Sequence, residues 1–256
     1  MKKFLTILLA VFHLTTGCDN TSSEKEYLVA TDATLAPMSF MSVGNDITGF
    51  EPDLMRALAK EARIDIQFVN VEWAGLFGGL ITQKFDMVIS SVTILEERKE
   101  RMAFSDPYLK SGLALVIRKD QTGIESFADA KKNDFLIGAQ IGTTAYFFLE
   151  KDATIRLKGY QIYGHAVTDL INGKIDAVLG ESTGTLFYKN QNKPLFEKIK
   201  MVGEIMTNEY YAIVLRQQDK KLMAKINTAL KKILQDGTVT QLHRKWDLGL
   251  AAQVPK

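Results

Sequence analysis

The chain has 256 residues, of which 46% are hydrophobic and 24% charged, with 32 lysines and arginines against 30 aspartates and glutamates. This composition is that of an ordinary globular protein, long enough for one large domain or two modest ones, and it excludes a disordered chain or a coiled coil. The balanced charge offers no basic field for nucleic acid, so nucleic acid is not an expected partner.

Residues 1–18 have the form of an export signal. Lys2 and Lys3 precede an apolar run over residues 4–14, which is too short to span a bilayer as a stable helix. The single cysteine, Cys18, ends this segment and resembles the lipidated cysteine of bacterial lipoproteins, although leucine is usual in those proteins where Thr15 stands. The alternative is cleavage nearby by an ordinary signal peptidase, which would leave an unpaired thiol.

These features predict a signal peptide over residues 1–18, with Cys18 as the lipidated first residue of the mature chain, and a polar tether over residues 19–25. Asp19-Asn20 resembles the signal that retains lipoproteins of Gram-negative bacteria in the inner membrane. In such a host the expected location is the periplasm, with a lipid anchor in the inner membrane. No further cysteine is present to form a disulfide.

Alternating strand and helix patterns begin after the tether and predict a parallel sheet. A loop marked by Pro37 follows the first strand, and Pro52 suits the first turn of the helix that comes next. This β-α-β-α-β order implies right-handed crossovers between parallel strands. The expected elements are strands over residues 27–31, 64–69 and 85–91 and helices over residues 49–63 and 73–83.

The pattern restarts after a strongly apolar strand over residues 113–117. Asp219 is expected to cap a long amphipathic helix that Asp236-Gly237 stops, and a helix over residues 238–246 closes the chain. The other expected elements are strands over residues 135–139, 161–163, 175–179 and 210–215, a helix after residues 142–144 and a helix over residues 166–172.

We therefore expect an α/β fold of two lobes, each a mainly parallel sheet flanked by helices. Because the strands near residues 113 and 210 bracket the second unit, the chain must cross twice between the lobes. The first lobe then comprises residues 26–109 and 208–256, and the second comprises residues 110–207. The expected hinges are residues 108–112 and 206–210.

A short stretch of the first lobe recurs in the second. Residues 80–93 align without gaps with residues 170–183, and Leu, Ile, Lys, Asp, Val and Thr recur in register. Two copies cannot form a solenoid, but they suit two related lobes. The register sets Ser91 opposite Glu181, each just after a strand, where open α/β sheets bind ligands. Shared periodicity could also produce so short a match by chance.

The two copies offer complementary chemistry. The first ends in the hydroxyls of Ser90, Ser91 and Thr93, and Arg98 returns beside them after an acidic turn. A guanidinium presents a planar pair of donors that matches the two oxygens of a carboxylate. The second copy offers the carboxylate of Glu181. A small molecule with both a carboxylate and an ammonium could therefore be held from two sides.

The Gly142-Thr143-Thr144 turn is a further candidate. It stands between a strand and a helix, where free backbone N–H groups point outward and suit a carboxylate. Thr143 could instead be a simple N-cap. Gln140, just before the turn, is a weaker candidate for the ligand site.

Six motifs, taken in order, resemble the polar amino-acid binding proteins of ABC importers, which belong to the bacterial extracellular solute-binding proteins of family 3. The resemblance covers nearly all of residues 26–248 and implies the periplasmic type II, or Venus-flytrap, fold. The motifs are TDATLAP (31–37), GFEPDL (49–54), SSVTILEER (90–98), FSDPY (104–108), GTT (142–144) and DGT (236–238).

The resemblance also implies roles for the candidate residues. Thr93, Arg98 and the 142–144 turn would hold the α-carboxylate of an L-amino acid, while Glu181, helped by Ser91, would hold its α-ammonium. Aspartate is usual in the family where Glu181 stands, so the longer side chain must sit differently or leave room for a smaller ligand. A purely structural alternative for Glu181 is an acid favoured by the N-terminus of a following helix.

Asp32, Leu35 and Trp73 resemble the side-chain pocket of this family. An aromatic residue is common where Leu35 stands, which leaves Trp73 to stack on one face of the ligand, unless Trp73 belongs to the core. Because Asp32 would be costly if left unpaired in a closing cleft, we expect a ligand with a donor side chain. A basic or amide amino acid, or histidine, meets that condition.

The expected function is the substrate-binding component of an ABC amino-acid importer. The zwitterion bridges the lobes and favours hinge closure, and the closed form, a monomer, docks on a permease in the inner membrane. No cofactor is implied, and no cluster of metal ligands is evident. A sensor's ligand-binding module is a second possibility, but no transmembrane helix or signalling domain follows in the sequence.

The main alternative is a periplasmic, dehydratase-like enzyme on the same fold that uses Glu181 as a general acid. Against it, His165 and His243 have no acid or nucleophile close in the sequence, and Cys18 is expected to carry lipid. The sequence therefore predicts a protein that is not an enzyme.

Overall fold

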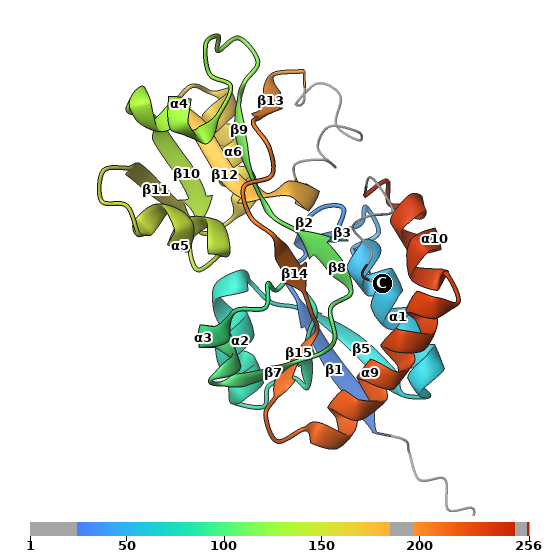
Figure 1. The fold of residues 1–256 in the computed structure, drawn as a ribbon. Coiled ribbons are helices and arrows are strands. Elements are labelled where there is room, and N and C mark those ends of the chain that lie inside the picture. The colour runs from blue at the N-terminus through green and yellow to red at the C-terminus, as the bar shows by residue number, and fades with distance from the viewer. Residues whose placement is uncertain (1–24, 185–196, 249–254, 256) are drawn as a thin grey trace, which may run out of the picture.

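The computed structural model describes residues 25–184, 197–248 and 255. In it the chain forms two lobes joined by a pair of adjacent strands (Figure 1). The predicted signal peptide, Cys18 and most of the tether lie outside the described residues. Within the described part, no helix is both long and apolar enough to cross a membrane.

The first lobe is built on a mixed sheet of five strands in the order β5-β1-β6-β15-β7. The first three strands run parallel and the last two pair antiparallel. The strands are β1 (Glu26–Thr31), β5 (Asp65–Asn70), β6 (Met87–Val88), β7 (Met102–Phe104) and β15 (Val214–Arg216). A small antiparallel sheet comprises β2 (Thr34–Leu35), β3 (Ser39–Met41) and β4 (Ile47–Thr48).

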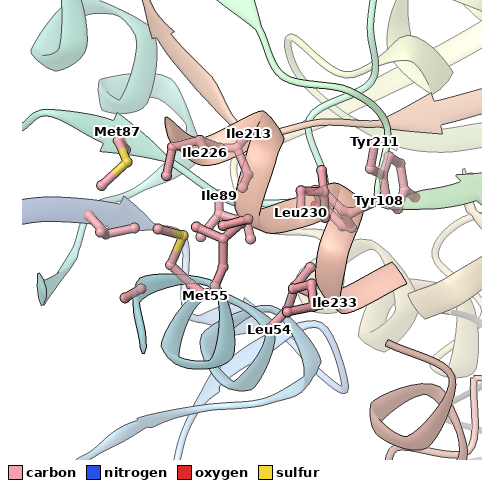
Figure 2. Packing of buried hydrophobic residues seen from close by; sticks show 14 of the residues in the cluster. Leu54, Met55, Met87, Ile89, Tyr108, Tyr211, Ile213, Ile226, Leu230 and Ile233 are labelled. Atoms are coloured by element: carbon pink, nitrogen blue, oxygen red, sulfur yellow. The ribbon is translucent and has the colours of Figure 1, made fainter. Parts of the chain in front are cut away.

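Helices cover both faces of this sheet. On one face lie α1 (Phe50–Ala62), α9 (Lys220–Gln235) and α10 (Thr238–Lys245), and on the other lies α2 (Trp73–Ile81), with the short α3 (Glu96–Lys99) nearby. Figure 2 shows Leu54 and Met55 of α1 packed into the same core as Leu230 and Ile233 of α9. Each of these buried side chains contributes about 1.5–3 kcal/mol through the hydrophobic effect.

The second lobe repeats this arrangement in its own five-stranded sheet, in the order β11-β10-β12-β9-β13. As in the first lobe, three neighbouring strands pair parallel, and the fourth, β9, runs antiparallel between β12 and β13. The strands are β9 (Leu113–Arg118), β10 (Leu136–Gln140), β11 (Arg156–Tyr160), β12 (Ala177–Glu181) and β13 (Ile199–Val202). Helices α4 (Phe127–Lys132) and α5 (Thr144–Glu150) cover one face, and α6 (Tyr163–Ile171) covers the other.

The predicted two-lobed α/β fold with mainly parallel sheets is confirmed, because in each sheet four strands run in one direction and one, β15 or β9, runs against them. The internal repeat also has a structural counterpart, because β6 and β12 take the third place in their sheets. The helices that precede them, α2 and α6, have the same length and start at positions related by the repeat's own offset.

Two short strands, β8 (Leu109–Ser111) and β14 (Glu209–Tyr211), carry the chain between the lobes and pair antiparallel (Figure 1). β8 lies within the predicted hinge 108–112, and β14 overlaps the predicted hinge 206–210 but ends one residue beyond it. At Gly112, just after β8, an added Cβ would lie 2.2 Å from the carbonyl oxygen of Thr207. The two crossing segments therefore pack backbone against backbone, which only glycine permits at this position.

Several predicted elements were wrong in detail. Residues 161–163 are not a strand, because β11 ends at Tyr160 and α6 begins at Tyr163. The single strand predicted over residues 210–215 is two strands, β14 and β15, which belong to different sheets. Asp219 occupies the N-cap position of α9 but makes no capping hydrogen bond, because its carboxylate pairs with Arg216 Nε at 2.7 Å.

Candidate ligand-binding site

A cleft between the lobes brings together all the candidate residues of the sequence. They come from strand ends, helix starts and loops of both lobes, and other side chains complete the lining. The candidates that line the cleft are Asp32, Leu35, Trp73, Ser90, Ser91, Thr93, Arg98, Gln140, Thr143, Thr144 and Glu181.

Arg98 is the buried cation of this cleft, with 9% of its surface exposed. Its Nη1 donates to the carbonyl oxygen of Thr93 at 2.9 Å, and its Nη2 reaches across the cleft to that of Gly142 at 3.1 Å. The guanidinium lies 5.6 Å and 5.2 Å from the ring centroids of Trp73 and Phe77. Burial lowers the pKa of Arg98 to about 10, which leaves it charged at neutral pH.

No carboxylate of the described residues lies within 4.0 Å of the Arg98 guanidinium. A desolvated cation without an ion-pair partner is unfavourable by itself, so this arrangement suits an anionic ligand.

The turn before α5 faces Arg98 from the second lobe. Thr143 Oγ1 donates to the Gln140 carbonyl oxygen at 2.7 Å and accepts from Tyr146 N at 3.3 Å, so Thr143 is indeed the N-cap of α5. The N–H groups of Thr144 and Ala145, in the first turn of this helix, have no acceptor among the described residues. A helix N-terminus of this kind attracts a carboxylate.

Glu181 lies at the end of β12, partly buried on the cleft wall. Its Oε2 accepts hydrogen bonds from Tyr211 Oη at 2.7 Å and Ser111 Oγ at 3.2 Å, while its Oε1 accepts from Thr144 Oγ1 at 2.9 Å. Burial raises the pKa of Glu181 to about 7, and the negative charge of the nearby Glu209 adds to the shift.

Glu209 is an acidic residue that the sequence reasoning missed. It stands at the start of the crossing strand β14, and only 9% of it is exposed. Its Oε2 accepts from Thr93 Oγ1 of the first lobe at 2.8 Å and from Thr144 Oγ1 of the second at 3.0 Å. Thr207 Oγ1 donates to its Oε1 at 2.7 Å. The feature of the sequence that could have identified Glu209 is an acidic residue within the predicted hinge, residues 206–210.

Glu51 is a second acid that was missed, although it belongs to one of the six motifs. Its Oε1 accepts from the N–H of Ser91 at 2.5 Å and from Ser91 Oγ at 3.0 Å, and Tyr108 donates to the same oxygen. Ser91 has a φ of 49°, a left-handed conformation that this carboxyl group holds in place. Because its hydroxyl proton is used, Ser91 Oγ faces the cleft as an acceptor.

Asp32 already has hydrogen-bond partners, although the expectation of a ligand with a donor side chain assumed that it would be unpaired. Its Oδ1 accepts from Thr34 Oγ1 at 2.7 Å, and its Oδ2 accepts from Trp73 N at 3.0 Å, at the first residue of α2. Burial raises its pKa. The backbone N–H of Asp32 donates to Ser90 Oγ at 3.0 Å, so Ser90 positions the strand end.

The remaining lining residues shape the cleft. Leu35 packs against core clusters of both lobes, and Gln140 Nε2 is held by the carbonyl oxygen of Gln161 at 2.8 Å. Tyr163 also lines the cleft, although it was not predicted. It starts α6 as Trp73 starts α2, so extending the internal repeat by a few residues would have found it.

Comparison with known proteins agrees with this geometry. Residues 27–249 match the family described as bacterial extracellular solute-binding proteins, family 3, which confirms the predicted resemblance. The chain is 31% identical over 253 residues to the ABC transporter arginine-binding protein 1 of Escherichia coli (strain K12), covering 96% of this chain and 99% of that protein.

Two solved structures extend the comparison. An ancestral arginine-binding protein bound to arginine is 34% identical, with a TM-score of 0.80 over 86% of this chain and 97% of its own. The ancestral amino acid-binding protein AncCDT-1, described as a precursor of cyclohexadienyl dehydratase, is 32% identical, with a TM-score of 0.79 over 86% and 95%. Within the described residues, no group of three or more His, Cys, Asp or Glu is placed to hold a metal.

Proposed function

The chain belongs to family 3 of the bacterial extracellular solute-binding proteins, and we infer from this membership and from its cleft that it is the amino-acid-binding component of an ABC importer. An L-amino acid zwitterion binds between the lobes and favours their closure about β8 and β14. The observation that carries this function is that Arg98 of one lobe and Glu181 of the other line the same cleft.

The contacts proposed for the α-carboxylate are charge-assisted. Arg98 supplies a planar pair of donors, and the N–H groups of Thr144 and Ala145 add the N-terminus of α5. The Thr93 hydroxyl is engaged by Glu209 in the structure, so its backbone N–H, which has no acceptor among the described residues, is the donor that we assign to the ligand.

The α-ammonium is proposed to bind on the opposite wall. Its N–H groups would donate to the carboxylate of Glu181 and to Ser91 Oγ, whose own proton is donated to Glu51. Glu181 and Ser91 Oγ would therefore both act as hydrogen-bond acceptors for the ammonium.

Asp32, Leu35, Trp73, Tyr163 and Gln140 surround the proposed side-chain pocket. Each Asp32 oxygen already accepts one hydrogen bond but can accept another, so a donor side chain still suits it. We therefore propose a basic or amide amino acid, or histidine. The relatives named for arginine binding support a basic ligand.

The family is extracellular or periplasmic. We further propose that residues 1–18 direct export, that Cys18 carries lipid and anchors the chain to the inner membrane, and that residues 19–25 are a tether. The lobes are assigned residues 26–109 with 208–256 and residues 110–207. The closed monomer would deliver its ligand to an ABC permease in the inner membrane.

One observation favours a second candidate function, a dehydratase-like enzyme. A general acid must be partly protonated at its working pH, and the pKa of about 7 at Glu181 satisfies that condition. The relatives reported above are nevertheless named as binding proteins, so we assign Glu181 to ligand binding and the chain no catalytic activity.

Thermal melting against the twenty amino acids tests the proposed function. A ligand present at about a hundred times its Kd stabilises the folded state by roughly 2.7 kcal/mol. For a protein of this size that is a rise in melting temperature of about 5–10 °C. We expect such a shift with a basic or amide amino acid or with histidine. A flat panel would contradict the binding function and favour the enzyme.

Replacing Asp32 with alanine tests the side-chain pocket in the same panel. Affinity for basic and amide amino acids or histidine should fall about tenfold or more, since a hydrogen bond to a charged group contributes roughly 1.5–3 kcal/mol. The exposed Asp46 provides the matched control, as Asp46→Ala should change nothing. If Asp32→Ala left the affinity for every amino acid unchanged, Asp32 would not contact the ligand.

A further inference from the structure

Two aromatic side chains of α2 hold the guanidinium of Arg98. Trp73 and Phe77 are four residues apart on this helix, so their side chains lie on the same face. The central carbon of the guanidinium is 5.2 Å from the ring centroid of Phe77 and 5.6 Å from that of Trp73. The two rings meet edge to face, with 5.3 Å between their centroids. A cation at such a distance is attracted by the negative face of an aromatic ring.

The two rings differ in their access to the ligand cleft. Trp73 lines the cleft together with Arg98. Phe77 is half-buried and does not line the cleft, but it lines an adjoining hollow that also borders Trp73 and Arg98. A ligand in the cleft therefore has no contact with Phe77, and any effect of Phe77 on binding must pass through Arg98.

The hydrogen bonds of the guanidinium come from both lobes. Within the first lobe, Arg98 Nη1 donates to the carbonyl oxygen of Thr93 at 2.9 Å. The bond from Nη2 to the carbonyl oxygen of Gly142, at 3.1 Å, joins Arg98 to the second lobe and is lost when the lobes separate. The rings of α2 remain with Arg98 in either case, because they belong to the first lobe. Leu76 and Leu80 are fully buried and fix this helix in the core.

We propose that Phe77 is a positioning residue of the carboxylate site, which acts through Arg98 without touching the ligand. It holds the guanidinium in place before the amino acid arrives, so that less conformational freedom is lost when the carboxylate binds. The inference rests on the proposed function. Every amino acid has the same α-carboxylate, so Phe77 should change the affinity for all ligands by the same factor. Asp32, which faces the side-chain pocket, should instead discriminate between them.

Replacing Phe77 with leucine tests this role. Leucine keeps an apolar side chain on α2 but removes the ring face that attracts the guanidinium. In calorimetric titration, Kd for each amino acid that binds the wild type should weaken about 2- to 30-fold, the range expected for one lost cation–π contact. The factor should be equal for all ligands. Phe77→Tyr keeps the ring and should restore wild-type affinity.

Phe127→Leu on α4 is the matched control. Phe127 is also half-buried and also meets a second ring edge to face, that of Phe148 at 5.5 Å. It does not line the cleft, and no cation of the described residues lies over its ring. This variant loses the same ring atoms and should bind with wild-type affinity.

The outcomes of the titration separate this proposal from the proposed function. Wild-type affinity in Phe77→Leu would overturn the role of Phe77 and leave the proposed function intact. A loss confined to some amino acids would also overturn it, because Phe77 would then act on the side-chain pocket. Failure of every amino acid to bind the wild type would contradict the proposed function itself.

Nitrogen-15 NMR of the arginine Nε–H groups tests the position of the guanidinium without any ligand. Ring currents of Trp73 and Phe77 should shift the Nε–H proton of Arg98 upfield of those of exposed arginines, and Arg98→Lys identifies this signal by its absence. In Phe77→Leu the signal should move towards the exposed position, whereas in Phe127→Leu it should stay. A wild-type signal at the exposed position would overturn the proposal even if Phe77→Leu failed to fold.

Discussion

Replacing Arg98 with alanine should severely weaken amino-acid binding. The guanidinium is buried against Trp73 and Phe77, and no acid of the described residues pairs with it, so the ligand carboxylate is the partner that its charge requires. Removing one member of such a buried, hydrogen-bonded charge pair costs about 2–5 kcal/mol or more. Kd should therefore weaken by roughly 30-fold to several thousand-fold, measured by calorimetric titration.

Two further variants separate charge from geometry. Arg98→Lys keeps the positive charge but loses the planar pair of donors and the contact with Gly142, so its affinity should lie between those of the wild type and the alanine variant. Arg101→Ala removes an exposed arginine close by in the sequence and should bind like the wild type. Wild-type affinity in Arg98→Ala would refute the assignment of the carboxylate site.

The candidate residues that line the cleft could be named from the sequence because their signals are local. Serines at a strand end, a glycine turn before a helix and an arginine after a short acidic turn each follow from a few adjacent residues. In parallel strands of paired lobes such ends must meet at the same edge. That is why Ser91, Arg98, Thr144 and Glu181 line one cleft, although they come from both lobes.

What escaped prediction depends on contacts that form only when distant segments meet. Glu209 joins the site because β14 brings it beside Thr93, more than a hundred residues earlier in the chain. The hydrogen bond from the N–H of Trp73, at the start of α2, to Asp32 likewise forms only in the tertiary structure. The sequence therefore could not show that this carboxylate already has a partner. Tyr163 is different, because it matches Trp73 at the same offset as the internal repeat. The aligned stretches, residues 80–93 and 170–183, did not extend back to this pair.

A second large effect should appear in the pH dependence of stability, through Glu51. This carboxyl is fully buried beneath the cleft, and burial raises its pKa from 4.5 to about 7, although Tyr108 and Ser91 donate to its Oε1. Its Oε2 has no hydrogen-bond partner among the described residues. The folded state therefore favours the neutral acid and binds a proton that the unfolded chain has released.

The sign follows from that difference in proton binding. The contribution of Glu51 to folding is fully present below about pH 4.5, its pKa when unfolded, and is lost as the pH rises through about 7. Each pH unit within this window is equivalent to about 1.4 kcal/mol, so the whole loss is roughly 3 kcal/mol. Ionising Glu51 at higher pH forces a buried charge onto the core of the first lobe.

Glu51→Gln isolates this effect, because glutamine keeps an acceptor for Ser91 and Tyr108 but never ionises. In urea unfolding, its stability relative to the wild type should increase by about 3 kcal/mol between pH 4.5 and 8. Glu181, which also titrates near pH 7, is common to both proteins and cancels from the difference. A pH-independent difference would mean that Glu51 is not neutral in the folded protein.

Glu51→Ala provides the contrast, because it removes the acceptor as well as the charge. The N–H and hydroxyl of Ser91 and the hydroxyl of Tyr108 would lose their shared partner, at about 1–3 kcal/mol for each group left unsatisfied. This variant should be destabilised at every pH and should bind ligand more weakly, since nothing then holds Ser91 in its left-handed conformation. Because Glu51→Gln retains that acceptor, the comparison separates the positioning of Ser91 from the titration of the buried acid.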